Sequence, residues 1–233
     1  MSRKATALAL LRGFFPGREA GFGAAEAAEG GQLYPTEIAG TPGRVVPQRE
    51  AEFRAGRMAA RAAMADLGIT PAAVPRGADR APLWPEGLYG SLTHTEGLAL
   101  AVVMRQGGAS PGIDLEPAAD LPAELIPAIL TPRERAWAAA EPQPGLAARL
   151  IFVAKEAGYK AQYPLSRSLL GFQEAEFEAI SGGAFRLRLK RSAGPLPQGF
   201  TFGGRYGFAA GFICAGALLP ALTQEGCLCS GAA

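Results

Sequence analysis

The segment from residue 172 to residue 190 carries the pattern that most restricts how this chain can fold. Acidic and then basic residues alternate with apolar ones on the two sides of a Ser-Gly-Gly turn: Glu174, Glu176, Glu178, Arg186, Arg188 and Lys190. A three-residue loop places 178 opposite 186, 176 opposite 188 and 174 opposite 190. Because alternate residues of a strand share a face, we predict an antiparallel hairpin with cross-strand ion pairs. These basic residues are therefore expected to be structural rather than to bind nucleic acid.

Three further segments are predicted to be strands. Residues 98–104 form a continuous apolar run with β-branched members, which is typical of a buried strand. Residues 112–116 indicate a short strand that ends at Pro117, and residues 206–215 indicate a third strand beside the hairpin. The stretch 13–48 is rich in Gly, Pro and Ala and is expected to form loops with short elements.

Helical patterns are clearest in three places. Apolar residues recur at helical spacing over residues 49–67, and Gly68 is expected to end this helix. Thr131 is followed by proline and then by Glu134, the pattern of a capping box at a helix start. A further helix is predicted over residues 146–163, ended by Pro164.

Composition limits the class of protein. The 233 residues are 48% hydrophobic, and the 31 Gly and 19 Pro are fewer than in disordered chains. A formal net charge of +2 argues against a general nucleic-acid or membrane-surface binder. No apolar run approaches the ~18 residues that cross a bilayer. The apolar stretch 5–11, which follows a basic N-terminus, is expected to be a buried first element rather than a targeting signal.

The cysteines and the distribution of elements complete this outline. Cys227 and Cys229 have no histidine nearby, so they lack the ligands of a zinc site, and an odd total of three fits a reduced, cytoplasmic protein. Each half of the chain supplies helix and strand in similar measure, with a hinge near residues 107–111. We therefore expect an α+β fold of two comparable subdomains, residues 1–108 and 109–233.

The first candidate site segment is Gly-Ser-Leu-Thr-His-Thr at residues 90–95. It places three hydroxyl groups and the sole histidine of the chain, His94, before the buried strand. Such donors suit a phosphate oxygen. The alternative is a histidine that is simply hydrogen-bonded as part of the structure.

The second candidate is the pair Asp114 and Glu116. Residues i and i+2 of a strand point to the same face, so the two carboxylates repel each other unless a cation lies between them. Ligands that are all oxygen suit Mg²⁺, which takes one or two carboxylates together with water and substrate phosphate. The alternative is an exposed polar strand face.

The third candidate is the segment 152–161. On a helix, three of its residues stack along one face and two others flank them: Phe152, Glu156, Lys160, Lys155 and Tyr159. Glycine 158 inside a helix costs ~1 kcal/mol relative to alanine, which indicates that another group approaches the backbone closely. An ordinary Glu–Lys surface pair is the alternative.

An arginine stripe joins these candidates. Arg54, Arg57 and Arg61 share one side of the helix predicted over residues 49–67, which suits either a solvated face or a face toward phosphate. Together, three carboxylates, two lysines, this stripe and the hydroxyl donors suit a polyanionic substrate whose transferred phosphorus lies on Mg²⁺.

In this order and spacing, the three segments resemble the 4′-phosphopantetheinyl transferase superfamily, with its patterns S-x-T-H, G-x-D-x-E and F-S-x-K-E-A-x-Y-K-A. They stand here at residues 91–94, 112–116 and 152–161, with Val153 in place of a common serine. Upstream, the residues around 33–37, 49–57 and 82–85 are similar to the enterobactin-synthase-component-D-like branch, although Ala81 weakens the match before Pro82. The resemblance covers about residues 33–165.

The resemblance implies a pseudo-dimer of two similar subdomains, each a small antiparallel sheet with a packed helix, with the active site at their interface. It implies transfer of 4′-phosphopantetheine from coenzyme A to a serine of an apo acyl or peptidyl carrier protein, with Mg²⁺ as cofactor and adenosine 3′,5′-bisphosphate as product. We expect these partners without nucleic acid or membrane, and a monomer. The branch points to siderophore or other non-ribosomal peptide or polyketide synthesis, without naming the carrier.

The family roles carry over residue by residue. Asp114, Glu116 and Glu156 match the Mg²⁺ ligands. Matches to coenzyme A contacts follow, the last two being weaker placements: Thr93, His94, Lys155, Lys160, Arg57, Arg49 and Arg80. Arg57 matches the residue that meets the nucleotide end.

In the mechanism that the resemblance implies, the carrier serine attacks the β-phosphorus of coenzyme A. Lys155 stabilises the leaving phosphate, and Glu156 takes the serine proton directly or through a metal-bound water. Two other functions stay open: a coenzyme A or carrier-protein binding module that has lost catalysis, and a Mg²⁺-dependent phosphohydrolase.

Overall fold

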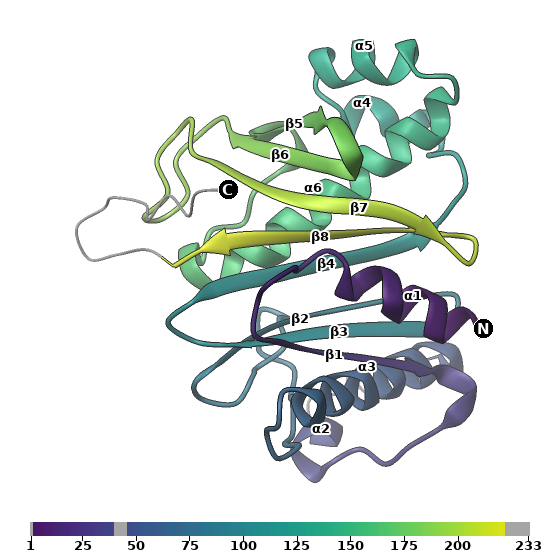
Figure 1. Ribbon diagram of the computed structural model, residues 1–233, viewed down its shortest axis with the longest axis vertical. Helices are drawn as coiled ribbons and strands as arrows, with labels where there is room; N and C mark the ends of the chain where they lie inside the picture. Colours follow the sequence, from purple (N-terminus) through teal and green to yellow (C-terminus); the bar gives the residue numbers. More distant parts are fainter. Residues whose placement is uncertain (1, 40–45, 222–233) are drawn as a thin grey trace.

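Two antiparallel sheets, each covered by one long helix, make up the fold (Figure 1). The computed structural model describes residues 2–39 and 46–221. The helices in this part are α1 (Arg3–Arg12), α2 (Pro35–Ala39), α3 (Pro47–Asp66), α4 (Ile126–Ile129), α5 (Pro132–Ala140) and α6 (Pro144–Ser166). The strands are β1 (Ala20–Glu26), β2 (Leu88–Thr95), β3 (Leu98–Arg105), β4 (Ala109–Pro117), β5 (Ala175–Ile180), β6 (Ala184–Leu189), β7 (Thr201–Ala209) and β8 (Phe212–Pro220). The α+β class predicted from the sequence is confirmed.

The first sheet has the strand order β1-β3-β2 and packs on α3. As its apolar run predicts, β3 is buried along almost its whole length. Strand β1 lies in a stretch that we expected to be mostly loop, because its Ala and Gly residues show no apolar alternation. A Cβ at Gly21 or Gly23 would overlap the backbone of Ala63 or Ala59 in α3. The small residues of β1 therefore let the strand and the helix approach backbone to backbone.

The second sheet has the order β4-β8-β7-β6-β5 and contains the predicted hairpin. Glu176 lies opposite Arg188 and Glu178 opposite Arg186, so the predicted register is confirmed. Of these two predicted ion pairs, Glu178–Arg186 forms, whereas Glu176 pairs with Arg133.

Glu174, in a 3₁₀ turn just before β5, also lies opposite position 190, where the amide of Lys190 donates to its carbonyl at 2.8 Å, but its side chain pairs with Arg191 instead of Lys190. Its carboxylate lies 2.5 Å from Nε of Arg191.

The single strand predicted over residues 206–215 is wrong, since this region spans two strands. β7 and β8 pair antiparallel, with Ala209 opposite Phe212. The two residues between them, Ala210 and Gly211, have φ angles of 52° and 82°. Left-handed backbone at both positions is what a two-residue hairpin turn requires, so the chain reverses here.

The helices largely follow the sequence prediction. Thr131 caps α5, and its capping box with Glu134 is confirmed. The buried first element is α1, whose Leu11 is fully buried. The predicted end of α6 is wrong, because the helix continues through Pro164 to Ser166. A proline in the last turn removes only one backbone hydrogen bond, and the helix ends where Arg167 turns left-handed at φ 52°.

The two sheets meet where β2 lies beside β4, and side-chain hydroxyls join them there. The amide N–H of Ile113 donates to Oγ of Ser91 at 3.0 Å. The amide N–H of Leu115 donates to Oγ1 of Thr93 at 3.1 Å. The two strands form no backbone ladder within the described residues. We call this pair of bonds the hydroxyl seam.

A buried apolar cluster beneath α1 also joins the two halves. It includes Leu11 of α1, Leu100 of β3, Ile113 of β4 and Phe212 of β8. The predicted boundary between residues 108 and 109 falls in the turn between β3 and β4, and the subdomain limits stay a prediction. Across residues 2–39 and 46–221, no helix is long and apolar enough to cross a membrane. The two cysteines at 227 and 229 lie outside the described residues.

Helix α6 packs against the second sheet as closely as α3 packs against the first. A Cβ at Gly112 of β4 would overlap the backbone of Ala157 in α6. A Cβ at Gly158 would overlap the side chain of Leu187 from β6. The close approach predicted at Gly158 is confirmed, and the approaching group is a core side chain. These contacts fix α6 beside the strand that carries Asp114.

We predict that Gly112→Ala lowers the free energy of unfolding by ~1–3 kcal/mol, because an added methyl must force β4 away from α6. Gly108→Ala is the matched control. Gly108 lies in the turn between β3 and β4, where a Cβ would meet only the Arg105 carbonyl at 3.9 Å. Equilibrium denaturation measures both variants, and equal stabilities would contradict the packing argument.

Candidate active site

A cleft of about 1170 Å³ lies between the two subdomains. Its walls come from α3, the loop 76–84, β2 and the C-terminal half of α6, and Asp114 of β4 also lines it. Eight of the residues predicted from the sequence line it: Arg49, Arg57, Arg80, Thr93, His94, Asp114, Glu156 and Lys160. The fold therefore gathers most of the predicted site from segments that are far apart in the sequence.

Asp114 is buried at the junction of β4 with β2 and α6. Its Oδ1 accepts hydrogen bonds from Thr93 Oγ1 at 3.0 Å and from Lys160 Nζ at 2.7 Å. Its Oδ2 is buried and has no hydrogen-bond partner. An unsatisfied buried carboxylate oxygen is energetically costly, so this atom is a candidate ligand for a cation.

Glu116 of β4 and Glu156 of α6 both lie near enough to Asp114 for their charges to interact with it, although Glu116 does not line the cleft. Burial raises the pKa of both carboxyls, and the charge of Asp114 adds to each shift. The repulsion between carboxylates that the strand pattern predicts is therefore present. Lys160 opposes it at Asp114, and Arg149 Nη1 lies 3.2 Å from Oε2 of Glu116.

The donor set fits Mg²⁺ chemically. Within the described residues, no group of three or more His, Cys, Asp or Glu side chains is close enough together to hold a metal ion as it stands. All three candidate ligands are nonetheless carboxylates, and Oδ2 of Asp114 lacks a protein partner. The Mg²⁺ site therefore stays a prediction.

Lys155 does not line the cleft. Its side chain is 0% exposed, and Nζ donates to Oε2 of Glu134 at 2.7 Å and to the carbonyls of Ile129 at 3.0 Å and Phe172 at 2.6 Å. All three ammonium hydrogens are thus in use. Burial lowers the pKa of Lys155, and Glu134 opposes that shift. The placement contradicts the prediction that Lys155 contacts phosphate. Neighbours on a helix point ~100° apart, so Lys155 faces the core when Glu156 faces the cleft.

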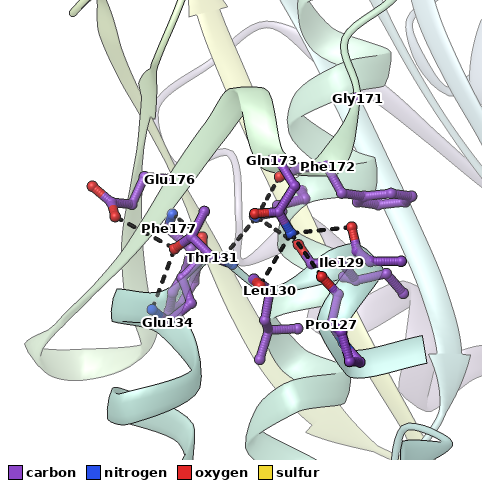
Figure 2. Close-up of polar contacts among 12 residues, drawn as sticks. Pro127, Ile129, Leu130, Thr131, Glu134, Gly171, Phe172, Gln173, Glu176 and Phe177 are labelled. Atoms are coloured by element: carbon purple, nitrogen blue, oxygen red, sulfur yellow. Dashed lines mark hydrogen bonds and ion pairs between the residues drawn. The ribbon is translucent and has the colours of Figure 1, made fainter. Parts of the chain in front are cut away.

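Glu134 connects this buried cluster to the start of α5 (Figure 2). Its Oε2 also accepts from the amide of Thr131 at 2.7 Å, and its Oε1 accepts from the amide of Phe177 at 2.5 Å. Beside it, Nε2 of Gln173 donates to three carbonyls of the segment 127–130 at 3.1 to 3.2 Å. The glutamate of the capping box is therefore also the counter-ion of a buried lysine.

Arg57 is an immobilised cation in the cleft wall. The side chain is buried, its guanidinium stacks over the ring of Phe53 at 3.9 Å, and its Nε has no hydrogen-bond partner. Burial lowers the pKa of Arg57 to about 10, so it remains charged at neutral pH. Arg54 and Arg61 on the same helix form ion pairs with glutamates. Two arginines of the stripe are therefore neutralised by glutamates, and Arg57 is the member best placed to bind an anion.

His94 lies in the same wall, with Nδ1 3.6 Å from Oε2 of Glu52. Desolvation lowers the pKa of His94, while the charge of Glu52 partly opposes the shift. The imidazole is therefore neutral at neutral pH and offers hydrogen bonds rather than a charge.

The cleft also contains residues that the sequence did not single out. Tyr163 donates to Oδ2 of Asp79 at 2.7 Å, which ties the loop 76–84 to the end of α6. Arg76 and Arg167 add two further cations. For Tyr163 a signal existed, because it lies seven residues after Glu156 and so on the same helix face. The loop positions carry no such periodicity.

Two family models match successive parts of the chain. The 4′-phosphopantetheinyl transferase N-terminal domain matches residues 43–104, and the 4′-phosphopantetheinyl transferase superfamily model matches residues 110–209. This chain belongs to the 4′-phosphopantetheinyl transferase superfamily. The first match ends and the second begins around the turn between β3 and β4, which links the first sheet to the second.

Curated relatives agree with this assignment. The 4′-phosphopantetheinyl transferase Npt of Nocardia iowensis is 38% identical over 77% of this chain and 89% of its own length. The 4′-phosphopantetheinyl transferase Svp of Streptomyces mobaraensis is 41% identical over 74% of this chain and 70% of its own. Enterobactin synthase component D of Salmonella typhi is 39% identical over 61% of this chain and 60% of its own. The predicted family and enzyme type are confirmed, and this family uses coenzyme A as donor.

We predict that Lys155→Met lowers the free energy of unfolding by ~3–5 kcal/mol, because it leaves the buried charge of Glu134 without its partner. Coenzyme A affinity of the folded fraction should not change. Lys160→Met is the matched control, since it makes the same substitution on the same helix but faces the cleft. Denaturation and calorimetric titration with coenzyme A measure the two effects. A stable Lys155→Met protein that no longer binds coenzyme A would contradict this prediction and show that Lys155 is a binding residue.

Proposed function

We propose that this transferase moves 4′-phosphopantetheine from coenzyme A to a serine of an apo acyl or peptidyl carrier protein, in a Mg²⁺-dependent reaction that releases adenosine 3′,5′-bisphosphate. One observation carries the proposal: a buried carboxylate with an unpartnered oxygen, Asp114, opens onto a cleft with cationic walls. Such a site suits a cation and a phosphorylated substrate together.

Asp114, Glu116 and Glu156 would hold the Mg²⁺. The ion would supply positive charge opposite the negative charge that develops on the pyrophosphate oxygens. Thr93 supports this set, because its hydroxyl donates to Oδ1 of Asp114 and thereby keeps that carboxylate in place. Oδ2 of the same residue is the oxygen left for the metal.

Glu156 is proposed to accept the proton of the carrier serine, directly or through a water molecule. The serine Oγ forms a bond to the β-phosphorus of coenzyme A, and the bond from that phosphorus to the bridging oxygen of the pyrophosphate breaks. The departing group is adenosine 3′,5′-bisphosphate. A base needs a pKa near the working pH, and the raised pKa of Glu156 supports this role.

The phosphates are proposed to contact Lys160 and the arginines of the cleft. Lys160 lies one helical turn after Glu156 and its ammonium already reaches Asp114, which supports a contact with the phosphate that would lie beside the metal. Arg57, Arg49 and Arg80 are proposed for the nucleotide end, together with His94. Lys155 has no part here, because its ammonium is committed in the core.

The biological setting is also a proposal. Both walls of the cleft come from one chain, which supports a monomer as the working unit. We propose a cytoplasmic enzyme, and the low net charge argues against a general nucleic-acid or membrane-surface partner. Similarity to enterobactin synthase component D supports a carrier from siderophore or other non-ribosomal peptide or polyketide synthesis.

We predict that the protein, incubated with coenzyme A, Mg²⁺ and an apo carrier protein, adds phosphopantetheine to the carrier, as seen by mass spectrometry. EDTA should stop the reaction. Asp114→Asn should slow it on the order of 10²-fold, the typical loss when one stabilising electrostatic group is removed. Glu178→Gln, a similar change on the exposed hairpin, serves as control.

Other outcomes of the same assay separate the competing functions. Release of adenosine bisphosphate without carrier modification would indicate a phosphohydrolase. Neither product would indicate a binding module. Turnover that survives EDTA would remove Mg²⁺ from the proposal.

We also predict that Arg57→Ala weakens coenzyme A binding about 10–100-fold, the range for a charge-assisted hydrogen bond. Dephospho-coenzyme A should lose much less, because it lacks the 3′-phosphate proposed to lie at Arg57. Arg54→Ala, whose half-buried arginine pairs with Glu50 and does not line the cleft, is the control on the same helix. Equal losses for the two ligands would remove Arg57 from the 3′-phosphate.

A further inference from the structure

Arg149 of α6 connects the end of β4 to the helix that carries Glu156. Its Nη1 donates to Oε2 of Glu116 at 3.2 Å. Its Nε donates to the carbonyl of Ala119 at 3.2 Å, and its Nη2 donates to the carbonyl of Asp120 at 3.0 Å. One largely buried guanidinium thus holds the Glu116 carboxylate and two backbone carbonyls of the segment after β4.

The segment after β4 is seated on the first turn of α6 by independent contacts. The amide of Leu121 donates to the carbonyl of Gly145 at 3.0 Å. A Cβ at Gly145 would overlap the side chain of Asp120, so only glycine allows this approach. The end of β4 is therefore fixed against α6, and Arg149 is the side chain that extends this attachment to Glu116.

The spacing along α6 links this attachment to the site. Glu156 lies seven residues after Arg149, two turns along the same helix face and roughly 10 Å away. Glu116 is on the strand and Glu156 is on the helix, so their separation depends on how β4 sits against α6. Arg149 belongs to α6 and hydrogen-bonds Glu116 of β4, so it connects the two elements at this point.

An arginine suits the task better than a lysine. Its planar group presents several donors in a fixed fork, whereas an ammonium is a point charge on a flexible stem. The contact uses one oxygen of Glu116, Oε2, and leaves the other oxygen for a second ligand.

We propose that Arg149 is a positioning residue: it orients the Glu116 carboxylate and fixes β4 against α6, so that Glu116 and Glu156 can bind the same divalent cation. This inference rests on the proposed metal-dependent function. It assigns Arg149 no contact with coenzyme A, and Arg149 does not line the cleft.

The sign of the effect separates positioning from simple electrostatics. Arg149 is itself a cation beside a cation site, so its charge alone weakens metal binding. If charge were its only influence, a neutral residue would strengthen that binding. If Arg149 positions the ligands, a neutral residue weakens it.

The experiment is a Mn²⁺ titration followed by electron paramagnetic resonance, with full-length protein at saturating coenzyme A. We expect Arg149→Gln to weaken Mn²⁺ about 10–100-fold, as the loss of residues that orient metal ligands does. Arg149→Lys, which keeps the charge but not the fork, should also weaken it. Arg186→Gln is the control, because its ion pair with Glu178 lies on the exposed hairpin. Coenzyme A affinity without metal should stay within about twofold in all variants.

A double variant tests whether Arg149 acts through Glu116. If it does, Arg149→Gln should cost little further Mn²⁺ affinity in a Glu116→Gln background. Full additivity, or Mn²⁺ binding by Arg149→Gln as tight as wild type or tighter, overturns the proposal. If Arg149→Gln does not fold, Arg149→Lys decides by the same criterion. Transfer activity with no Mn²⁺ binding by wild type would overturn the metal role and this inference, while leaving the transferase assignment intact.

Discussion

The hydroxyl seam between β2 and β4 is the interaction on which the site depends. Ser91 and Thr93 accept hydrogen bonds from two amides of β4, and this joins two sheets that share no ladder in the described residues. The Thr93 hydroxyl then donates its own hydrogen to Asp114. One short side chain therefore takes part in the join between the subdomains and also holds the central acid. The cleft exists because the sheets meet along this line rather than merging into one sheet.

A second polar cluster organises the far side of α6. Lys155 and Glu134 form a buried ion pair, and backbone groups of the segments before α5 and around β5 occupy their remaining hydrogen-bonding positions. A buried charge is tolerated only when it is paired and fully hydrogen-bonded, and that condition is met here. The cluster holds α6 from behind, while Gly112 brings β4 against its other side. The helix is thus fixed on both faces, and Glu156 is fixed with it.

Much of this arrangement could be predicted from short patterns, because those patterns reflect local geometry. The alternating charges fixed the register of β5 and β6, and the Asp114–Glu116 spacing gave the acidic face of β4. Two of the predictions that failed did so because they depended on distant partners. The sequence of β1 predicts a loop, because the role of its glycines, which is to let α3 approach the strand closely, is visible only in the folded structure. The direction of Lys155 is set by Glu134, twenty-one positions earlier in the sequence, which no helical pattern around residue 155 can show.

Thr93 joins the two subdomains and also holds Asp114, and this affects how the phenotype of any variant at this position can be interpreted. A substitution there alters the join between the subdomains and the surroundings of Asp114 in a single step. Loss of activity in such a variant cannot be divided into a folding part and a chemical part by the substitution alone. Ser91 accepts its seam bond from Ile113 but, unlike Thr93, does not hydrogen-bond Asp114, so it offers the reference that Thr93 lacks. Comparing the two positions would separate the mechanical role of the seam from its electrostatic one.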